Sequence, residues 1–221
     1  MVPGFFLTFE GVDGVGKTTQ MERLTARLRA AGCEPVLAQE PGGTRIGAEI
    51  RRLLLDARNA DLRPIPELLL YFASRAQNIA EVIRPALERG RVVLCDRFTD
   101  ATVAYQGYGR ELGAETVRQI EKVACGGLAP DLTLWLDLDP TLGVERALER
   151  HAERPLDEDE TRMEREGRAF YARVLEGYRA IQRGEPERVR RIRAAGSIDD
   201  VEAEILAAVG PLLTERLGVH L

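Results

Sequence analysis

The sequence predicts a three-layer α/β fold in which a parallel sheet of five strands carries helices on both faces. Short apolar runs alternate with segments of helical periodicity along the 221 residues, and strands separated by helices pair in parallel through right-handed crossovers. A glycine-rich turn joins the first strand to the first helix, which is typical of such sheets. Because no internal repeat or linker divides the chain, we expect residues 1–221 to form a single domain.

Each predicted element rests on a local pattern. Short, largely apolar runs predict strands at residues 5–9, 36–38, 92–95 and 132–136. We expect residues 189–192, which are apolar at both ends, to supply the last strand. Helical spacing predicts helices at residues 17–31, 46–55, 67–89, 140–151, 161–183 and 198–217, and further helical patterns fill the gaps. We expect Gly32 and Gly90 to end helices, Pro64 and Pro66 to break the chain before residue 67, and residues 152–160 to form a charged loop.

The composition excludes several classes of protein. Hydrophobic residues make up 44% and charged residues 30% of the chain, which is typical of a folded globular protein. The net charge of −5 argues against a surface that follows a nucleic-acid backbone. The three cysteines lie far apart, without the spacing of a zinc site or a disulfide framework. No apolar run approaches the ~20 residues that cross a bilayer, and the N-terminus has no basic stretch. We therefore expect a cytoplasmic protein that binds neither nucleic acid nor membrane.

Residues 11–18, GVDGVGKT, match the phosphate-loop pattern GxxxxGK[ST] directly after a predicted strand and at the start of a helix. Glycines let backbone N–H groups turn toward a phosphate, and the helix N-terminus adds partial positive charge. Lys17 is expected to reach the β- and γ-phosphates, and the Thr18 hydroxyl to bind Mg²⁺. The pattern thus predicts a P-loop NTPase fold whose ATP-binding residues are Gly11, Val12, Asp13, Gly14, Val15, Gly16, Lys17, Thr18 and Thr19.

Three kinds of protein use such a loop. A switch GTPase needs an NKxD motif, but the chain has asparagine only at Asn59 and Asn78, and neither precedes lysine. A partitioning ATPase, which is a partner-binding switch, has a phosphate loop of the form KGGxGKT with an additional early lysine, whereas position 11 here is glycine. This class of protein remains an alternative. The third kind transfers phosphate to a small acceptor.

Asp96 and Arg97 fit phosphate transfer, because they follow the apolar strand at residues 92–95. In an open α/β sheet a strand-end carboxylate lies at the crevice above the phosphate loop, where it can hold Mg²⁺ or orient the acceptor. An adjacent arginine can bind the acceptor phosphate. Asp137 is a rival strand-end carboxylate without an adjacent cation. A phosphate acceptor is largely dianionic near neutral pH and needs no general base.

The transferring phosphate also requires cations and exclusion of water. Arginines crowd the charged segment, and we expect it to form a lid at about residues 150–162. Most of these arginines are expected to form a solvated face, and one or two to reach the phosphates.

Together these features resemble the bacterial thymidylate kinase family over nearly the whole chain. The motifs that carry the resemblance are GVDGVGKTT at 11–19, EPGGT at 40–44, YFASRAQ at 71–77, DRFTDATVAYQG at 96–107 and PDLTLWLD at 130–137. The resemblance implies an ATP-dependent nucleoside-monophosphate kinase that converts dTMP to dTDP with Mg²⁺ in dTTP biosynthesis, and it implies a homodimer. Another monophosphate kinase, acting on UMP or CMP, is the alternative enzyme.

The resemblance also implies roles for acceptor-site residues. Asp13 resembles the acidic residue at the sugar 3′-hydroxyl, and Glu40 the acidic residue near the acceptor. Arg51 and Arg97 resemble the clamp on the acceptor phosphate. Tyr71 stands where the family usually stacks phenylalanine on thymine.

The remaining predicted acceptor residues concern the base and the sugar. Phe72 is the alternative stacking residue if the helix register differs. Arg75 is one turn beyond Tyr71 and resembles the residue that hydrogen-bonds the base carbonyl. Thr102 resembles the residue at the base edge, and Tyr105 the ring beneath the deoxyribose that rejects a 2′-hydroxyl, with Gln106 close by.

The chain departs from related patterns at several positions. Gly14 follows Asp13, where the eukaryotic form has arginine, so the compensating cations are expected from the lid, as in the bacterial class. We expect Arg154 and Arg162 to supply them, since residues 161–164, TRME, resemble the family's DRxE. Phe98 stands where tyrosine or histidine is common.

Overall fold

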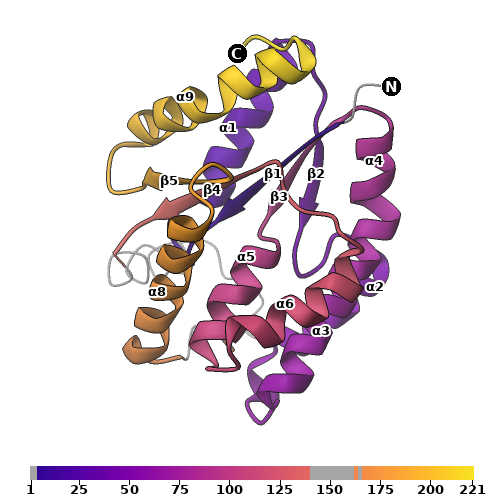
Figure 1. Cartoon of the computed structure of the whole chain (residues 1–221), viewed down its shortest axis with the longest axis vertical. Coiled ribbons are helices and arrows are strands. Elements are labelled where there is room, and N and C mark those ends of the chain that lie inside the picture. Colours follow the sequence, from indigo (N-terminus) through magenta and orange to yellow (C-terminus); the bar gives the residue numbers. More distant parts are fainter. Residues whose placement is uncertain (1–3, 140–161, 164–165) are drawn as a thin grey trace.

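Five parallel strands form the sheet, in the order β2-β3-β1-β4-β5. The computed structural model describes residues 4–139, 162–163 and 166–221 (Figure 1). The strands are β1 (Phe5–Glu10), β2 (Val36–Gln39), β3 (Val92–Asp96), β4 (Leu132–Asp137) and β5 (Val189–Arg193). The predicted α/β class with five parallel strands is confirmed.

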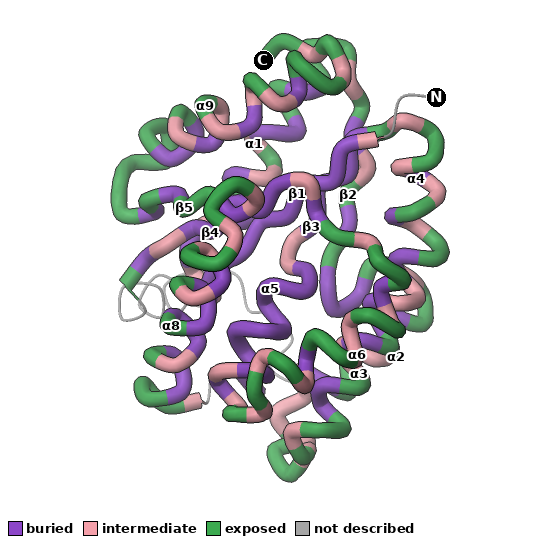
Figure 2. The backbone as a smooth tube through the Cα atoms, viewed as in Figure 1, coloured by how far each residue is buried: buried purple, intermediate pink, exposed green. Residues whose placement is uncertain are grey.

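The central strands are apolar because both faces of the sheet are covered. Every residue of β1 is buried, as are all but the last residue of β3 and of β4. Figure 2 shows this buried centre as continuous purple tubes. Near-continuous apolar runs are the expected pattern for parallel strands between two helical layers.

The helices form two layers around the sheet. Helices α1 (Lys17–Ala30) and α9 (Ile198–Leu217) lie together on one face, and α8 (Arg168–Gly184) lies on the other (Figure 1). Helix α8 packs closely against the π-helical segment Val103–Gly109. Ser197 and Asp200 form a capping box at the start of α9, which begins and ends where the sequence predicts. No helix in the described ranges is long and apolar enough to span a bilayer.

The other helices precede and follow β3 in the chain. They are α2 (Arg45–Leu55), α3 (Pro64–Asn78), α4 (Arg84–Glu88), α5 (Thr99–Thr102) and α6 (Ala114–Cys125). Helix α4 lies at the amino end of β1, where the Gly4 N–H donates to the Leu87 carbonyl oxygen at 3.1 Å. Helix α3 packs against both α2 and α6 (Figure 1). The π-helical segment Val103–Gly109 directly extends α5, so a short α-helix and a π-helical segment lie between β3 and α6.

Two predicted helices differ in the structure. The helix expected at residues 67–89 begins at Pro64, because proline is well suited to a first helical turn. It then passes through a π-helical turn, Ile79–Ile83, before α4, in which Pro85 lacks the N–H of a regular helix. The helix expected from residue 161 begins only at Arg168, after Gly167. The predicted helix at 140–151, the loop at 152–160 and most of the predicted lid lie outside the described residues.

Candidate active site

The phosphate loop joins β1 to α1, and two of its glycines explain the pattern. At Gly11 φ is 134°, and an added Cβ would lie 2.5 Å from the Leu136 carbonyl oxygen of β4. At Gly16, the N-cap residue of α1, φ is 92°, a conformation that residues with a Cβ rarely adopt. Since Gly16 has no side chain with which to cap the helix, the first N–H groups of α1 can bind an anion.

Lys17 lies folded back over the loop. Its Nζ donates to the carbonyl oxygens of Val12 at 3.1 Å and Gly11 at 3.3 Å, and it lies 3.9 Å from a carboxylate oxygen of Asp13. Burial, followed by the nearby Arg97 guanidinium, lowers the pKa of Lys17. The ammonium group is therefore a desolvated cation at the start of α1, which strengthens its attraction to a phosphate.

The other predicted loop residues divide between core and surface. The side chains of Val12 and Val15 are buried in the hydrophobic core, so only their backbone can serve a ligand. Thr18 and Thr19 are exposed. Thr18 lines the cavity described below, whereas Thr19 is not among its lining residues.

Asp96 ends β3, beside the phosphate loop, as its sequence position predicts. Its Oδ1 atom is buried and has no hydrogen-bond partner within the described residues. An unpaired buried carboxylate oxygen is costly unless a ligand or ion completes it. In the described ranges, no group of three or more His, Cys, Asp or Glu side chains could hold a metal ion by themselves. One carboxylate and the Thr18 hydroxyl therefore fit an ion that arrives with phosphate ligands, as Mg²⁺ does.

Arg97 connects β3 to the phosphate loop. Its Nη1 donates to the Gly11 carbonyl oxygen at 2.9 Å, and its Nη2 to Asp13 Oδ1 at 2.7 Å. The guanidinium also lies 5.0 Å from the ring centroid of Tyr105. Its φ of 68° is in the left-handed region although it is not glycine.

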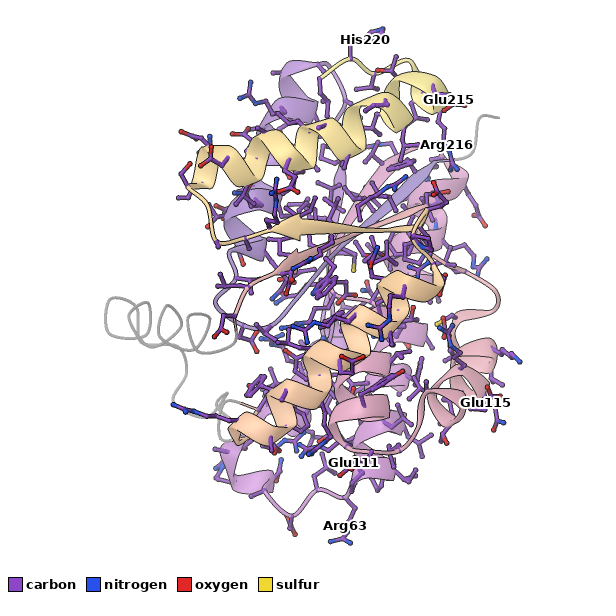
Figure 3. All side chains as sticks on the ribbon, turned by 60° about the vertical axis from the view of Figure 1, so that its left-hand side comes forward. Arg63, Glu111, Glu115, Glu215, Arg216 and His220 are labelled. Atoms are coloured by element: carbon purple, nitrogen blue, oxygen red, sulfur yellow. The ribbon has the colours of Figure 1, made fainter. Side chains whose placement is uncertain are left out.

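A cavity of about 200 Å³ opens between the phosphate loop and the irregular segments that follow β3. Its lining includes most of the predicted site: Asp13, Gly14, Gly16, Lys17, Thr18, Glu40, Arg51, Tyr71, Arg75, Asp96, Arg97, Thr102, Tyr105 and Gln106. Gln39, Pro41, Leu55, Ala101 and Met163 complete it. His220 lies at the far end of the molecule beyond α9 (Figure 3), so it cannot serve this cavity as a base.

A buried ion pair forms one wall of the cavity. The guanidinium of Arg75 pairs with the Glu40 carboxylate, and both side chains are 2% exposed. Arg75 also donates to Thr102 Oγ1 at 2.9 Å and lies between the rings of Phe72 and Phe98, 5.0 and 5.1 Å from their centroids. Burial raises the pKa of Glu40. The wall is thus a fixed array of donors rather than a mobile cation.

The two candidate stacking residues on α3 lie differently. Tyr71 lines the cavity, and burial, followed by the Glu67 carboxylate, raises its pKa to about 12. Its phenol is therefore neutral across the physiological range. Phe72 is buried beneath Arg75 and is absent from the cavity lining.

Arg51, Tyr105 and Gln106 also line the cavity. Arg51 Nη1 donates to the Pro41 carbonyl oxygen at 3.1 Å. The Tyr105 ring is nearly buried. Gln106 Nε2 donates to Glu67 Oε1 at 2.8 Å. The last two residues lie on the π-helical segment, which the sequence patterns did not predict.

Of the two predicted lid arginines, only Arg162 lies within the described residues. Arg162 is buried, and its Nη2 donates to Glu67 Oε2 at 2.6 Å, while its N–H donates to the Leu55 carbonyl oxygen at 3.1 Å. Arg110 pairs with the same Glu67 carboxylate at 3.1 Å. Arg162 is thus held by a carboxylate on α3 and does not line the cavity. Arg154 lies outside the described residues.

Sequence reasoning missed two buried carboxylates behind the cavity, Glu10 and Glu67. Glu10 has a local signal, because it ends an apolar strand directly before the phosphate loop. Glu67 has none, since its partners Gln106, Arg110 and Arg162 lie 39, 43 and 95 residues away.

Comparisons with known proteins identify the family of this chain. The family model for thymidylate kinase matches residues 9–205. The thymidylate kinase of Desulfovibrio desulfuricans is 49% identical over 96% of this chain and 97% of its own length. That of Solidesulfovibrio magneticus is 50% identical over 94% of this chain and 100% of its own. The crystal structure of thymidylate kinase from Ehrlichia chaffeensis has a TM-score of 0.72 and 31% identity, covering 94% of this chain and 99% of that one.

Proposed function

The chain belongs to the thymidylate kinase family and phosphorylates dTMP with ATP, and we propose that both reactants meet in the cavity between the phosphate loop and Arg75. The observation that carries this proposal is the shared lining of one cavity. Lys17 and Thr18 of the phosphate loop line it together with Tyr71, Arg75 and other predicted acceptor residues.

The donor half of the cavity suits the phosphates of ATP. Backbone N–H groups of residues 11–19 and the desolvated Lys17 hold the phosphates. The Thr18 hydroxyl and Asp96 would hold Mg²⁺, and Asp96 Oδ1, which has no hydrogen-bond partner in the described part of the chain, supports that assignment. When bound, Mg²⁺ neutralises charge on the transferring phosphate.

The acceptor phosphate lies between the two halves. Arg51 and Arg97 both line the cavity, and their guanidinium groups can bind a phosphate through paired donors. The phosphate oxygen of dTMP attacks in line, without a covalent intermediate. Because that oxygen is already ionised near neutral pH, no side chain has to accept a proton.

The thymidine part of dTMP binds beside the cavity wall that contains Arg75. Arg75 and Thr102 bind the polar edge of thymine, Tyr71 stacks on its ring, and Gln106 lies beside it. Tyr105 lies beneath the deoxyribose and rejects a 2′-hydroxyl.

Asp13 and Glu40 supply the carboxylates of the acceptor site. Asp13, which is half-exposed at the cavity, binds the 3′-hydroxyl. Glu40 acts through Arg75, whose guanidinium it pairs with.

Arg154 and Arg162 remain our candidates for the cations that reach ATP. The contacts of Arg162 add a condition, because its guanidinium is bound to Glu67. Arg162 reaches the phosphates only by leaving that carboxylate, so its contribution depends on a rearrangement near residues 162–163.

We also propose a homodimer. Ile46 and Leu53, seven residues apart on α2, and Ile65 and Leu69, four apart on α3, are exposed large hydrophobic residues, and the two helices pack side by side (Figure 1). Exposed apolar side chains on two neighbouring helices suit a contact with a second copy. Light scattering on the purified protein tests whether it is a homodimer.

We also propose a cytoplasmic location, which agrees with the use of ATP and dTMP.

A coupled assay of ATP turnover with dTMP, dUMP, UMP, CMP, AMP and GMP tests the substrate assignment. We expect dTMP to be the preferred acceptor. Preference for UMP or CMP would favour the alternative kinase, and hydrolysis independent of any acceptor would favour a switch ATPase.

A further inference from the structure

Glu10 is a buried carboxylate at the end of β1 that does not line the cavity. The residue is fully buried. Its Oε1 accepts a hydrogen bond from the Phe98 N–H at 2.7 Å, and its Oε2 accepts one from the Tyr178 hydroxyl at 3.0 Å. Any effect of Glu10 on the reaction must therefore pass through these neighbours.

The residue before Phe98 has an unfavourable backbone conformation. Arg97 has a φ of 68°, a region that residues with a Cβ occupy only where their surroundings hold them. The Arg97 N–H donates to the Phe9 carbonyl oxygen at 2.9 Å. Phe98, which follows Arg97, is held through both of its backbone polar groups, because Glu10 accepts from its N–H and Arg75 Nη2 donates to its carbonyl oxygen at 3.0 Å.

This conformation determines where the Arg97 side chain points. Its guanidinium reaches the Gly11 carbonyl oxygen at 2.9 Å and Asp13 at 2.7 Å. A return of φ to negative values would turn the Cα–Cβ bond, and the guanidinium would lose these partners at the phosphate loop.

We propose that Glu10 is a positioning residue: by holding the Phe98 N–H, it keeps Arg97 in the left-handed conformation that directs its guanidinium to the acceptor phosphate. The inference rests on the role of Arg97 given under Proposed function. Glu10 contacts neither substrate.

The chemistry of the carboxyl group suggests a conservative variant. Burial, followed by the Asp100 carboxylate, raises the pKa of Glu10 to about 8 against the opposing influence of Arg97. Tyr178 also faces the group. A carboxyl group that retains its proton near neutral pH resembles a glutamine amide, whose oxygen can accept from the Phe98 N–H and whose Nε2 can donate to the Tyr178 hydroxyl.

The test compares Glu10→Gln with Glu10→Met, each alone and combined with Arg97→Ala. Glu10→Met fills similar space without the carboxyl oxygens. We expect it to lower kcat/KM for dTMP by about 10²-fold, the scale of losing one positioned transition-state donor, while the Kd for ATP without dTMP stays close to that of the wild type. Glu10→Gln should retain most of the activity. Tyr178→Phe is the control, because it removes only the other hydrogen bond of the carboxyl group and should retain activity.

In the Arg97→Ala background, Glu10→Met should cause little further loss; multiplicative losses would overturn the inference. Thermal unfolding of each variant is measured alongside. If Glu10→Met does not fold, Glu10→Gln decides: a folded Glu10→Gln protein that loses dTMP turnover as severely as Arg97→Ala contradicts the proposal. If Arg97→Ala itself leaves dTMP use unchanged, the role proposed for Arg97 is wrong and the inference falls with it.

Discussion

Replacing Arg75 by methionine should destabilise the fold through the charge that it leaves behind. In the structure the Arg75 guanidinium pairs with Glu40, donates to Thr102 at 2.9 Å and donates to the Phe98 carbonyl oxygen at 3.0 Å. Methionine fills much of the space between the rings of Phe72 and Phe98 but supplies none of these donors. The main energetic change is therefore an unpaired, buried Glu40 carboxylate.

The magnitude follows from that carboxylate. Removing one partner of a buried ion pair costs about 3–5 kcal/mol. At roughly 2–4 °C per kcal/mol for a chain of this length, Tm should fall by roughly 6–20 °C. Asn78 Nδ2, 3.3 Å from Glu40, offsets part of the loss. Because burial raises the pKa of Glu40, the unpaired carboxyl group takes up a proton in acid, so the loss should be smaller at pH 5 than at pH 8.

Urea and thermal unfolding of four proteins measure this effect: wild type, Arg75→Met, Glu40→Met and the double variant. Replacing both partners by apolar residues removes the unpaired charge, so the double variant should be more stable than Arg75→Met alone. Arg179→Met, at an exposed position on α8, is the matched control and should change stability little. A double variant no more stable than Arg75→Met, or an Arg75→Met protein as stable as the control, would refute the reasoning.

Three further predictions concern the phosphate loop, the lid and Glu10. Lys17→Ala should lower kcat by about 10²-fold or more, whereas the control Lys122→Ala, at an exposed site on α6, should leave kcat unchanged. Steady-state assays with ATP and dTMP compare the two variants. Near-normal phosphate transfer by Lys17→Ala would contradict a role of Lys17 in binding the phosphates. Arg162→Ala should lower kcat far more than it weakens dTMP binding, so unchanged turnover with a raised Kd for dTMP would count against a phosphate contact. The pKa of Glu10 rises from 4.5 to about 8 on folding, so the folded state binds the proton more tightly and the stability that this proton contributes is lost as pH rises from about 4.5 to 8. In Glu10→Gln the free energy of unfolding, measured with urea, should therefore depend less on pH over this range. Equal pH dependence in both proteins would exclude the effect.

Local patterns were sufficient for most of the fold. A segment of three to five residues between helical segments predicts a parallel strand, four of the five predicted segments are largely apolar, and all five are strands of the sheet. The carboxyl ends of parallel strands share one edge, so Asp96 and the loop at residues 11–18 were expected together before any coordinates, and both line the cavity. The helix at residues 198–217 could also be predicted from local sequence, because the capping box at its start lies within four residues.

The features that sequence analysis did not predict depend on contacts between residues that are distant in the chain. The π-helical segment Val103–Gly109 carries two cavity residues, but its apolar spacing does not separate it from an ordinary helix. Arg162 lies in an arginine-rich segment that predicts a lid, yet its guanidinium binds Glu67, 95 residues away in sequence. Neither local propensity nor motif spacing carries information on such a partner.

The sequence by itself determined the order of strands and helices, the phosphate loop and the family, because each is encoded in residues that are neighbours along the chain. Only the tertiary structure decided that Tyr71 rather than Phe72 faces the cavity, that Arg75 is locked to Glu40, and that Glu10 supports the turn at Arg97 from 88 residues away. These outcomes depend on which buried donor meets which acceptor, and folding must bring the two together before either can be satisfied.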